Sequence, residues 1–164
     1  MPTEKCNMKI RFVTVGKTVE KYLVEACSEY EKRIKKYVQF ETVVLRDLKN
    51  TSTLGFDQVK EQEARLLEPY MTPSAYKIVL DEHGTEYTSV KFSELLSRKM
   101  VSPGKDITFI IGGPYGLHQR ILEAADMSMS LSRMTFSHQM VRLIFLEQLY
   151  RAFTIMRGEP YHHE

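Results

Sequence analysis

The sequence predicts a single α/β domain whose mostly parallel sheet is flanked by helices. Its 164 residues fit one domain, and strand-like and helix-like segments alternate along the whole chain. Parallel strands need a crossover connection, usually a helix, so this alternation favours a parallel sheet with helices on both faces. No repeat, low-complexity tract or linker interrupts the pattern. We expect one domain over residues 8–164 and a flexible N-terminal extension over residues 1–7.

The first half of the chain is predicted to form three strands and two helices. The strands share buried-type apolar or β-branched runs, and the helices share apolar residues at every third or fourth position. In chain order these are a strand at 9–15, a helix from about 19 to 34, a strand at 40–45, a helix at 56–67 and a strand at 75–80. Gly16 closes the first strand, a polar loop covers residues 47–55, and Pro69 and Pro73 end the second helix.

The second half continues the alternation. In chain order we expect a turn at 81–84, a helix ending at residue 100, a turn at 102–104, a strand at 107–111, a helix at 117–125, a strand at 127–131 and a helix from 138 to about 156. Ser93 and Ser137 are predicted to cap the first and last of these helices, because a serine oxygen accepts hydrogen bonds from the free N–H groups at a helix start.

The last predicted helix is apolar around nearly its whole circumference. Such a helix is buried on all sides, whereas a sheet covers only one helix face. Half of that burial would then come from a second copy of the chain, which predicts a homodimer. The alternative is a helix that lies at the centre of a single core.

Charge and composition exclude several classes of protein. The net charge is +2, too small to indicate a nucleic-acid-binding protein by itself. No apolar run approaches the roughly 20 residues that span a bilayer, and the N-terminus lacks the apolar core of a secretory signal, so we expect a cytoplasmic protein without a membrane segment. Cys6 and Cys27 form neither a disulfide framework nor a metal site, and the adjacent His162 and His163 are more typical of a chain end than of metal ligands. We expect no metal.

The glycines after the predicted strand at 107–111 indicate a backbone-lined ligand site. Phosphate-loop, dinucleotide-binding and serine-nucleophile motifs are all missing from the sequence. Open α/β sheets bind ligands at the carboxyl ends of their strands. Three such ends carry candidates: Leu80, Gly112 with Gly113, and the apolar segment 131–136. A tight turn is the alternative explanation of the two glycines, but an apolar slot rich in backbone groups suits a purine ring.

The same residues resemble the ribosomal large-subunit methyltransferase H family, within the SPOUT methyltransferases. The resemblance covers nearly the whole chain except residues 1–7. Its motifs are Met8-Lys9-Ile10, Val15-Gly16-Lys17, Leu80-Asp81-Glu82-His83-Gly84, Ile111-Gly112-Gly113-Pro114-Tyr115-Gly116-Leu117, Leu131-Ser132-Arg133-Met134-Thr135-Phe136, His138-Gln139-Met140-Val141-Arg142, Glu147-Gln148-Leu149-Tyr150-Arg151-Ala152-Phe153 and Tyr161-His162.

The resemblance implies a fold, a cofactor, a partner and a substrate. The fold is an α/β knot with a deep trefoil knot in the C-terminal half. The cofactor is S-adenosylmethionine, the partner is a second copy of the chain, and the substrate is a pseudouridine of bacterial 23S rRNA, methylated at N3 in the assembled ribosome. The implied cofactor-binding residues are Leu80, Gly112, Gly113, Leu131, Ser132, Arg133, Met134, Thr135 and Phe136.

Methyl transfer to N3 also requires removal of the N3 proton. The candidate catalytic residues are His138, Arg142, Tyr161 and His162. A histidine accepts a proton near neutral pH, whereas an arginine instead holds phosphate or stabilises negative charge on the base carbonyls. Alternatively, His138 is only a polar residue at a helix start.

Four further positions complete the expectations for the C-terminal part. Glu147 and Arg151 are spaced for an ion pair within one helix. Ser137 stands where the family usually has proline, and His163 where it has a basic residue. His163 is largely neutral at pH 7, which weakens any phosphate contact at that position.

Two other functions remain open from the sequence. One is a non-catalytic ribosome-binding or assembly factor that keeps the cofactor slot. The other is a related methyltransferase directed at tRNA.

Overall fold

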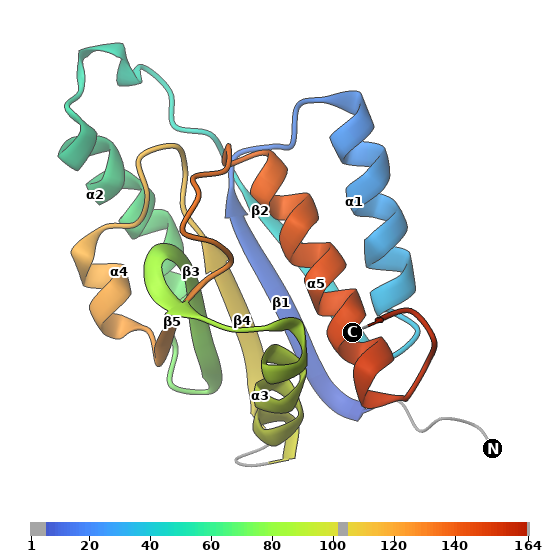
Figure 1. Cartoon of the computed structure of the whole chain (residues 1–164). Helices are drawn as coiled ribbons and strands as arrows, with labels where there is room; N and C mark the ends of the chain where they lie inside the picture. Colours follow the sequence, from blue (N-terminus) through green and yellow to red (C-terminus); the bar gives the residue numbers. More distant parts are fainter. Residues whose placement is uncertain (1–5, 102–104, 164) are drawn as a thin grey trace.

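The computed structural model describes residues 6–101 and 105–163, and within these ranges a five-stranded parallel sheet is covered by helices on both faces (Figure 1). The strands are β1 (Cys6–Val15), β2 (Val38–Leu45), β3 (Ala75–Glu86), β4 (Asp106–Ile111) and β5 (Met127–Ser130). The helices are α1 (Lys21–Ile34), α2 (Phe56–Leu67), α3 (Ser89–Val101), α4 (Gln119–Ala124) and α5 (Met140–Met156). The strands lie in the order β2-β1-β4-β3-β5, and all neighbours are parallel. The predicted α/β fold with a parallel sheet is confirmed.

The core has two layers because side chains alternate between the faces of each strand. Ile10 and Phe12 of β1 join a cluster on the face covered by α1, α3 and α5, whereas Val13 and Val15 join a cluster on the face covered by α2 and α4 (Figure 1). Phe109 of β4, which is fully buried, belongs to the first cluster. The sheet is therefore buried on both sides, as its apolar strands predict.

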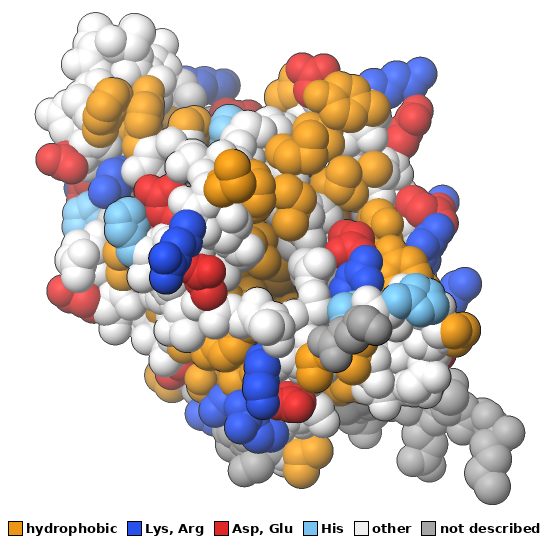
Figure 2. All heavy atoms as spheres, in the orientation of Figure 1, with side chains coloured by type: hydrophobic (Ala, Val, Ile, Leu, Met, Phe, Trp, Pro, Cys, Tyr) orange, Lys and Arg blue, Asp and Glu red, His pale blue; other side chains and the backbone are white. Residues whose placement is uncertain are grey.

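Helix α5 lies between α1 and α3 on one face of the sheet (Figure 1). Its inner side is buried, and the rings of Phe145 and Phe12 are 4.5 Å apart. The alternative of a helix central to one core is thus partly correct. Half-buried apolar side chains nevertheless remain on α5, and Figure 2 shows hydrophobic side chains gathered over this helix. These are Met140, Val141, Leu143, Ile144, Ile155 and Met156.

Two predictions between β3 and α3 are wrong. Residues 81–84 do not form a turn but continue β3 as far as Glu86, with a register shift against β5 between Leu80 and Thr85. A Cβ on Gly84 would come within 2.7 Å of the Met129 backbone nitrogen, so glycine lets the two strands approach. Helix α3 begins at Ser89, and Ser93 lies buried inside it, where its hydroxyl donates to the Val90 carbonyl.

The remaining predictions at the chain's segment ends have mixed outcomes. Strand β1 starts at Cys6, so Cys6 and Asn7 belong to a strand rather than to the extension; residues 1–5 and the turn at 102–104 lie outside the described residues. The cap by Ser137 is confirmed, since its hydroxyl accepts a 3.0 Å hydrogen bond from the Met140 N–H.

In the described part of the chain, no helix is both long and apolar enough to cross a bilayer. The trefoil knot stays a prediction from the resemblance.

Candidate functional site

A pocket opens where β3, β4 and β5 reach the same level of the sheet. Leu80 of β3 pairs with Ile111 of β4 on one side and with Met129 of β5 on the other. The segments that follow surround a pocket of about 620 Å³, within the range of roughly 300–1,000 Å³ of small-molecule sites. The pocket lining includes most of the predicted cofactor-binding residues: Leu80, Gly112, Gly113, Leu131, Ser132, Met134, Thr135 and Phe136.

The loop after β4 lines the pocket with the backbone of its glycines, Gly112, Gly113 and Gly116. The Gly116 N–H donates to the Gly113 carbonyl at 3.1 Å, and Gly116 has a φ of +84°, which favours glycine. A Cβ on Gly112 would lie 2.8 Å from the Gly116 carbonyl oxygen. The loop is therefore both a tight turn and a wall of the pocket.

Glu63 of α2 holds this loop from behind. Glu63 is 5% exposed, and its carboxylate accepts a 3.0 Å hydrogen bond from the Gly113 N–H. Sequence reasoning missed this residue. One feature of the sequence could have revealed it. Glu63 lies four residues from Val59 and from Leu67, on the buried face of α2, where an apolar residue is usual.

Replacement of Glu63 by glutamine should change how stability depends on pH. Burial raises the pKa of Glu63 above its ordinary value of 4.5, although the Gly113 N–H partly opposes this. Because the folded-state pKa is the higher one, protonation favours the folded state. We expect wild type to lose stability relative to Glu63→Gln as the pH rises from about 4.5 through the raised pKa. Urea unfolding of both proteins at pH 4.5 to 8 measures this difference.

Glu61→Gln provides a control whose stability difference from wild type should not vary over this pH range. The hydrogen bond from Arg120 lowers the pKa of Glu61 below its ordinary value of 4.5, so its contribution is lost only as the pH falls below about 4.5. A difference between wild type and Glu63→Gln that does not vary with pH would contradict the prediction for Glu63.

The segment after β5 is shaped by its own hydroxyl groups. Ser130 donates to the Ser132 carbonyl at 2.8 Å, and the Met134 N–H donates to the Ser132 hydroxyl at 2.9 Å. Thr135 donates to Glu82 at 3.1 Å, which ties the segment to β3. Arg133 departs from the prediction, because its side chain is 90% exposed, is absent from the pocket lining and pairs with Glu86.

His138 lines the pocket just before α5. Burial, followed by the nearby Arg142 charge, lowers the pKa of this half-buried histidine. A neutral imidazole is the form that accepts a proton. The neighbouring Gln139 amide accepts from the Val19 N–H at 2.9 Å and donates to the Lys17 carbonyl at 3.0 Å, which fixes this end of the helix against the β1–α1 connection.

Arg142 does not line this pocket. Its side chain is buried, and its guanidinium donates to the carbonyls of Val15, Gly16 and His138 at 2.8 to 3.2 Å, and to the Thr18 hydroxyl at 3.2 Å. Arg142 thus ties the end of β1 to the start of α5. This structural role differs from the phosphate-holding or charge-stabilising role expected from the sequence.

Tyr161 and His162 follow α5 in the chain and fold back along it. The Tyr161 hydroxyl donates to Glu147 at 3.1 Å, and the His162 imidazole Nδ1 lies 3.1 Å from an Arg151 guanidinium nitrogen. The predicted Glu147–Arg151 pair is confirmed, with a hydrogen bond of 3.0 Å. With 17 residues, α5 is roughly 25 Å long. The tail folds back along this helix as far as Glu147, so within one chain it still lies roughly 14 Å or more along the helix from His138.

The described residues do not include a group of three or more histidine, cysteine or acidic side chains that could hold a metal ion. Two acidic side chains, Asp81 and Glu82, and one lysine, Lys60, line the pocket beside apolar walls that include Leu80, Ile111 and Phe136. The arrangement suits an organic ligand with an aromatic part and positive charge.

Comparison with known proteins agrees with this geometry. Residues 8–162 match the family model described as "Predicted SPOUT methyltransferase". A Parabacteroides distasonis protein named "Ribosomal RNA large subunit methyltransferase H" is 48% identical, and a Flavobacterium johnsoniae protein of the same name is 46% identical; each match covers 96% of this chain and 100% of the relative.

Solved structures agree in fold. A probable methyltransferase from Bordetella pertussis aligns with a TM-score of 0.56 and 12% identity over 88% of this chain and 96% of its own. A probable methylase family protein from Haemophilus influenzae aligns with a TM-score of 0.52 and 10% identity over 96% and 71%. The family match over nearly the full length and the identity to the curated relatives show that the chain belongs to the SPOUT methyltransferases.

Proposed function

We propose that this chain transfers a methyl group from S-adenosylmethionine to N3 of a pseudouridine in bacterial 23S rRNA, within the assembled ribosome in the cytoplasm. The observation that carries the proposal is the strand-end pocket, whose walls come from the segments that the family resemblance assigns to the cofactor. The rRNA methyltransferase names of the full-length relatives support the same activity. With a net charge of only +2, the chain fits docking on an assembled particle better than tight binding to naked RNA.

The pocket residues fit the proposed cofactor. Leu80, Leu131 and Phe136 offer an apolar slot for the adenine ring, and the backbone at Gly112 and Gly113 offers hydrogen-bonding groups to its edge. Because a Cβ at Gly112 would meet the loop itself, bare backbone is built into this wall. Asp81 and Glu82 add negative charge for a cationic ligand.

The chemical task of the protein is mainly positioning. When bound, the cofactor supplies a reactive methyl group on a positively charged sulfur. The chain must hold the base with N3 in line, keep water out and accept the N3 proton. His138 is the candidate acceptor at the pocket, because its lowered pKa keeps the imidazole neutral at pH 7.

We further propose that the active site is completed by the tail of a second copy. Tyr161 and His162 contact Glu147 and Arg151, which lie roughly 14 and 20 Å farther along the helix than His138, so one chain does not bring these catalytic candidates together. A two-fold related copy packed on the half-buried apolar side chains of α5 would bring its tail toward the other pocket. This homodimer also covers the hydrophobic surface seen over α5 in Figure 2.

The test of the function is a methyl-transfer assay with three RNA substrates. The protein and labelled S-adenosylmethionine are incubated with unmodified ribosomes, separated subunits and free tRNA, and nucleoside mass spectrometry then locates the methyl group. Methylated pseudouridine from ribosomes alone is the expected result. Label on tRNA would make the chain a tRNA enzyme, and cofactor binding without transfer would make it a non-catalytic ribosome factor.

A mixed dimer tests the shared site. Gly112→Ala should disable the pocket, and His162→Ala should disable the tail. If pocket and tail come from different copies, a purified heterodimer of the two variants has one intact site and about half of the wild-type activity, although both homodimers are inactive. If pocket and tail act within one chain, the heterodimer has no intact site and stays inactive.

A further inference from the structure

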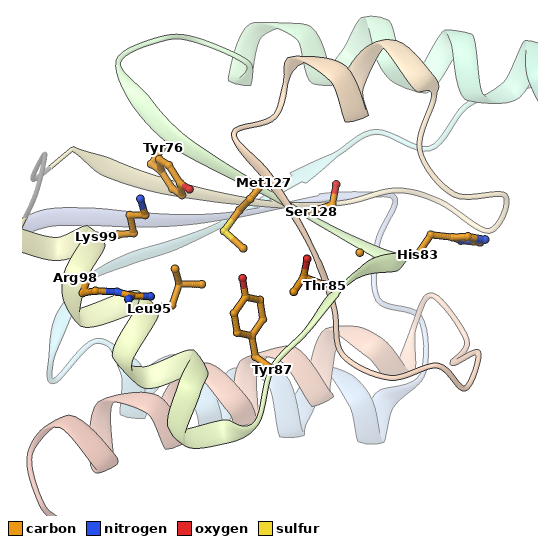
Figure 3. Close-up of a pocket in the computed structure, with 10 residues that line it drawn as sticks. Tyr76, His83, Thr85, Tyr87, Leu95, Arg98, Lys99, Met127 and Ser128 are labelled. Atoms are coloured by element: carbon orange, nitrogen blue, oxygen red, sulfur yellow. The ribbon is translucent and has the colours of Figure 1, made fainter.

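A second hollow lies between α3 and the paired strands β3 and β5, outside the cofactor pocket (Figure 3). Its volume is about 840 Å³. The lining residues come from these three elements and the connection between β3 and α3: Tyr76, His83, Gly84, Thr85, Tyr87, Leu95, Arg98, Lys99, Met127 and Ser128. We call this hollow the α3 groove.

The α3 groove is positively charged. Arg98 and Lys99 line it, and no aspartate or glutamate is among its lining residues. Arg98 is exposed and makes no ion pair or hydrogen bond with any residue in the ranges 6–101 and 105–163. Lys99 lies 4.4 Å from the centre of the Tyr76 ring rather than beside a carboxylate. Figure 2 shows lysine and arginine side chains gathered over α3 at the lower side of the molecule.

Two tyrosines give the α3 groove aromatic walls. Figure 3 shows the Tyr76 and Tyr87 side chains extending into the hollow, with the Lys99 amine near Tyr76 and the Arg98 guanidinium directed toward Leu95 and Tyr87. Neither tyrosine hydroxyl has a hydrogen bond within the described part of the chain. Both hydroxyls are therefore free to pair with a ligand.

The α3 groove adjoins the proposed reaction site. His83 lines both the groove and the cofactor pocket, because the extended end of β3 runs between them. A polymer whose reacting unit lies at the pocket therefore has a short path over His83 into the groove.

We propose that the α3 groove binds the part of the substrate RNA next to the target nucleotide, with Arg98 and Lys99 on its phosphates and Tyr87 against a base. A guanidinium without a protein partner matches the geometry of a phosphate, and an aromatic wall stacks bases without regard to sequence. The charge complementarity and the continuity with the pocket both favour a single-stranded polyanion. The proposal rests on the proposed RNA substrate.

Neutralising the two cations tests the proposal. Arg98→Gln/Lys99→Gln should raise the KM for ribosomes about tenfold or more and leave kcat largely intact, because phosphate contacts position the substrate. The slope of log KM against log salt concentration should fall by about one for each lost phosphate contact. Calorimetric S-adenosylmethionine binding should not change, which shows that the variant is folded and its pocket intact.

Lys32→Gln/Lys35→Gln is the matched control, since it removes the same charge from exposed positions in the last turn of α1 and directly after it. The control should keep the wild-type KM and salt slope within about twofold. Equal KM values and salt slopes for the two double variants would overturn the proposal. Loss of dimerisation in Arg98→Gln/Lys99→Gln would also overturn it, because the groove would then hold a second copy of the chain.

Direct RNA binding separates failure of the groove from failure of the proposed function. Anisotropy of a labelled single-stranded rRNA fragment is measured with wild type and with both double variants. If wild type methylates no RNA but only the Arg98→Gln/Lys99→Gln variant loses binding, the groove stands and the reaction is wrong. If wild type methylates ribosomes and both double variants bind the fragment as wild type does, the groove proposal fails.

The stacking part of the proposal has its own variants. Tyr87→Phe keeps the ring and should retain binding of the fragment, whereas Tyr87→Leu should weaken it about tenfold. Equal binding by the two variants would show that the ring does not stack on a base.

Discussion

Gly112→Ala is expected to abolish measurable cofactor binding at ordinary concentrations. The added Cβ would lie 2.8 Å from the carbonyl oxygen and 2.9 Å from the carbonyl carbon of Gly116. These are backbone atoms that cannot rotate away, so the loop lining the pocket must shift. We expect the Kd for S-adenosylmethionine, measured by calorimetry, to rise at least 100-fold, or about 2.8 kcal/mol.

Gly55→Ala is the matched control for this substitution. Gly55 precedes α2, has a φ of −71° and has no atom within 4 Å of an added Cβ. The same chemical change there should leave cofactor affinity unchanged. Wild-type affinity in Gly112→Ala would show that the backbone after β4 does not form the cofactor wall.

Arg142→Met is expected to destabilise the protein by about 3–5 kcal/mol. Methionine fills much of the same volume but donates no hydrogen bond, so it leaves the buried carbonyls of Val15 and Gly16 without the partners they have at 2.9 and 2.8 Å. Urea unfolding at one fixed protein concentration measures the loss, since a dimer's stability depends on concentration.

The comparison variant for Arg142 is Arg65→Met. Arg65 is on α2 with a side chain 72% exposed and a 3.6 Å ion pair to Glu61; its loss should cost less than about 1 kcal/mol. Arg142→Lys distinguishes the two roles considered for this arginine. A variant that is stable and binds cofactor but transfers no methyl group would restore the catalytic role inferred from the sequence.

The sequence by itself predicted the elements whose signals are local. The apolar run at residues 107–111 and the glycines that follow it determine a buried strand and a bare turn, because β-branched side chains and missing Cβ atoms act within a few residues. The alternation of such segments with amphipathic helices was enough for the parallel α/β fold. The strand-end rule also led to the pocket that the structure shows beside Leu80 and the segment 131–136, although Arg133 does not line it.

Contacts between distant segments were beyond the sequence pattern. The glycine at position 84 indicated a turn, yet it serves the close approach of β3 to the Met129 backbone. The sequence suggested a catalytic role for Arg142. Its hydrogen-bond partners, the carbonyls of Val15 and Gly16, could not be inferred because they are 127 and 126 positions away in the chain. Glu63 belongs to no recognisable motif. Its role in holding the loop after β4 depends on a hydrogen bond from Gly113, which is 50 residues later in the chain.

Local chemistry therefore determined the strands, the helices and most of the residues that line the strand-end pocket. Tertiary packing decided which polar side chains support that pocket and which ones lie away from it. It also placed the Tyr161–His162 tail against Glu147 and Arg151, more than two turns of α5 away from His138. The physical reason is that periodicity and turn chemistry arise between neighbours in the chain, whereas a buried charge or a close backbone approach is satisfied by whatever atoms the packed sheet and helices bring to it.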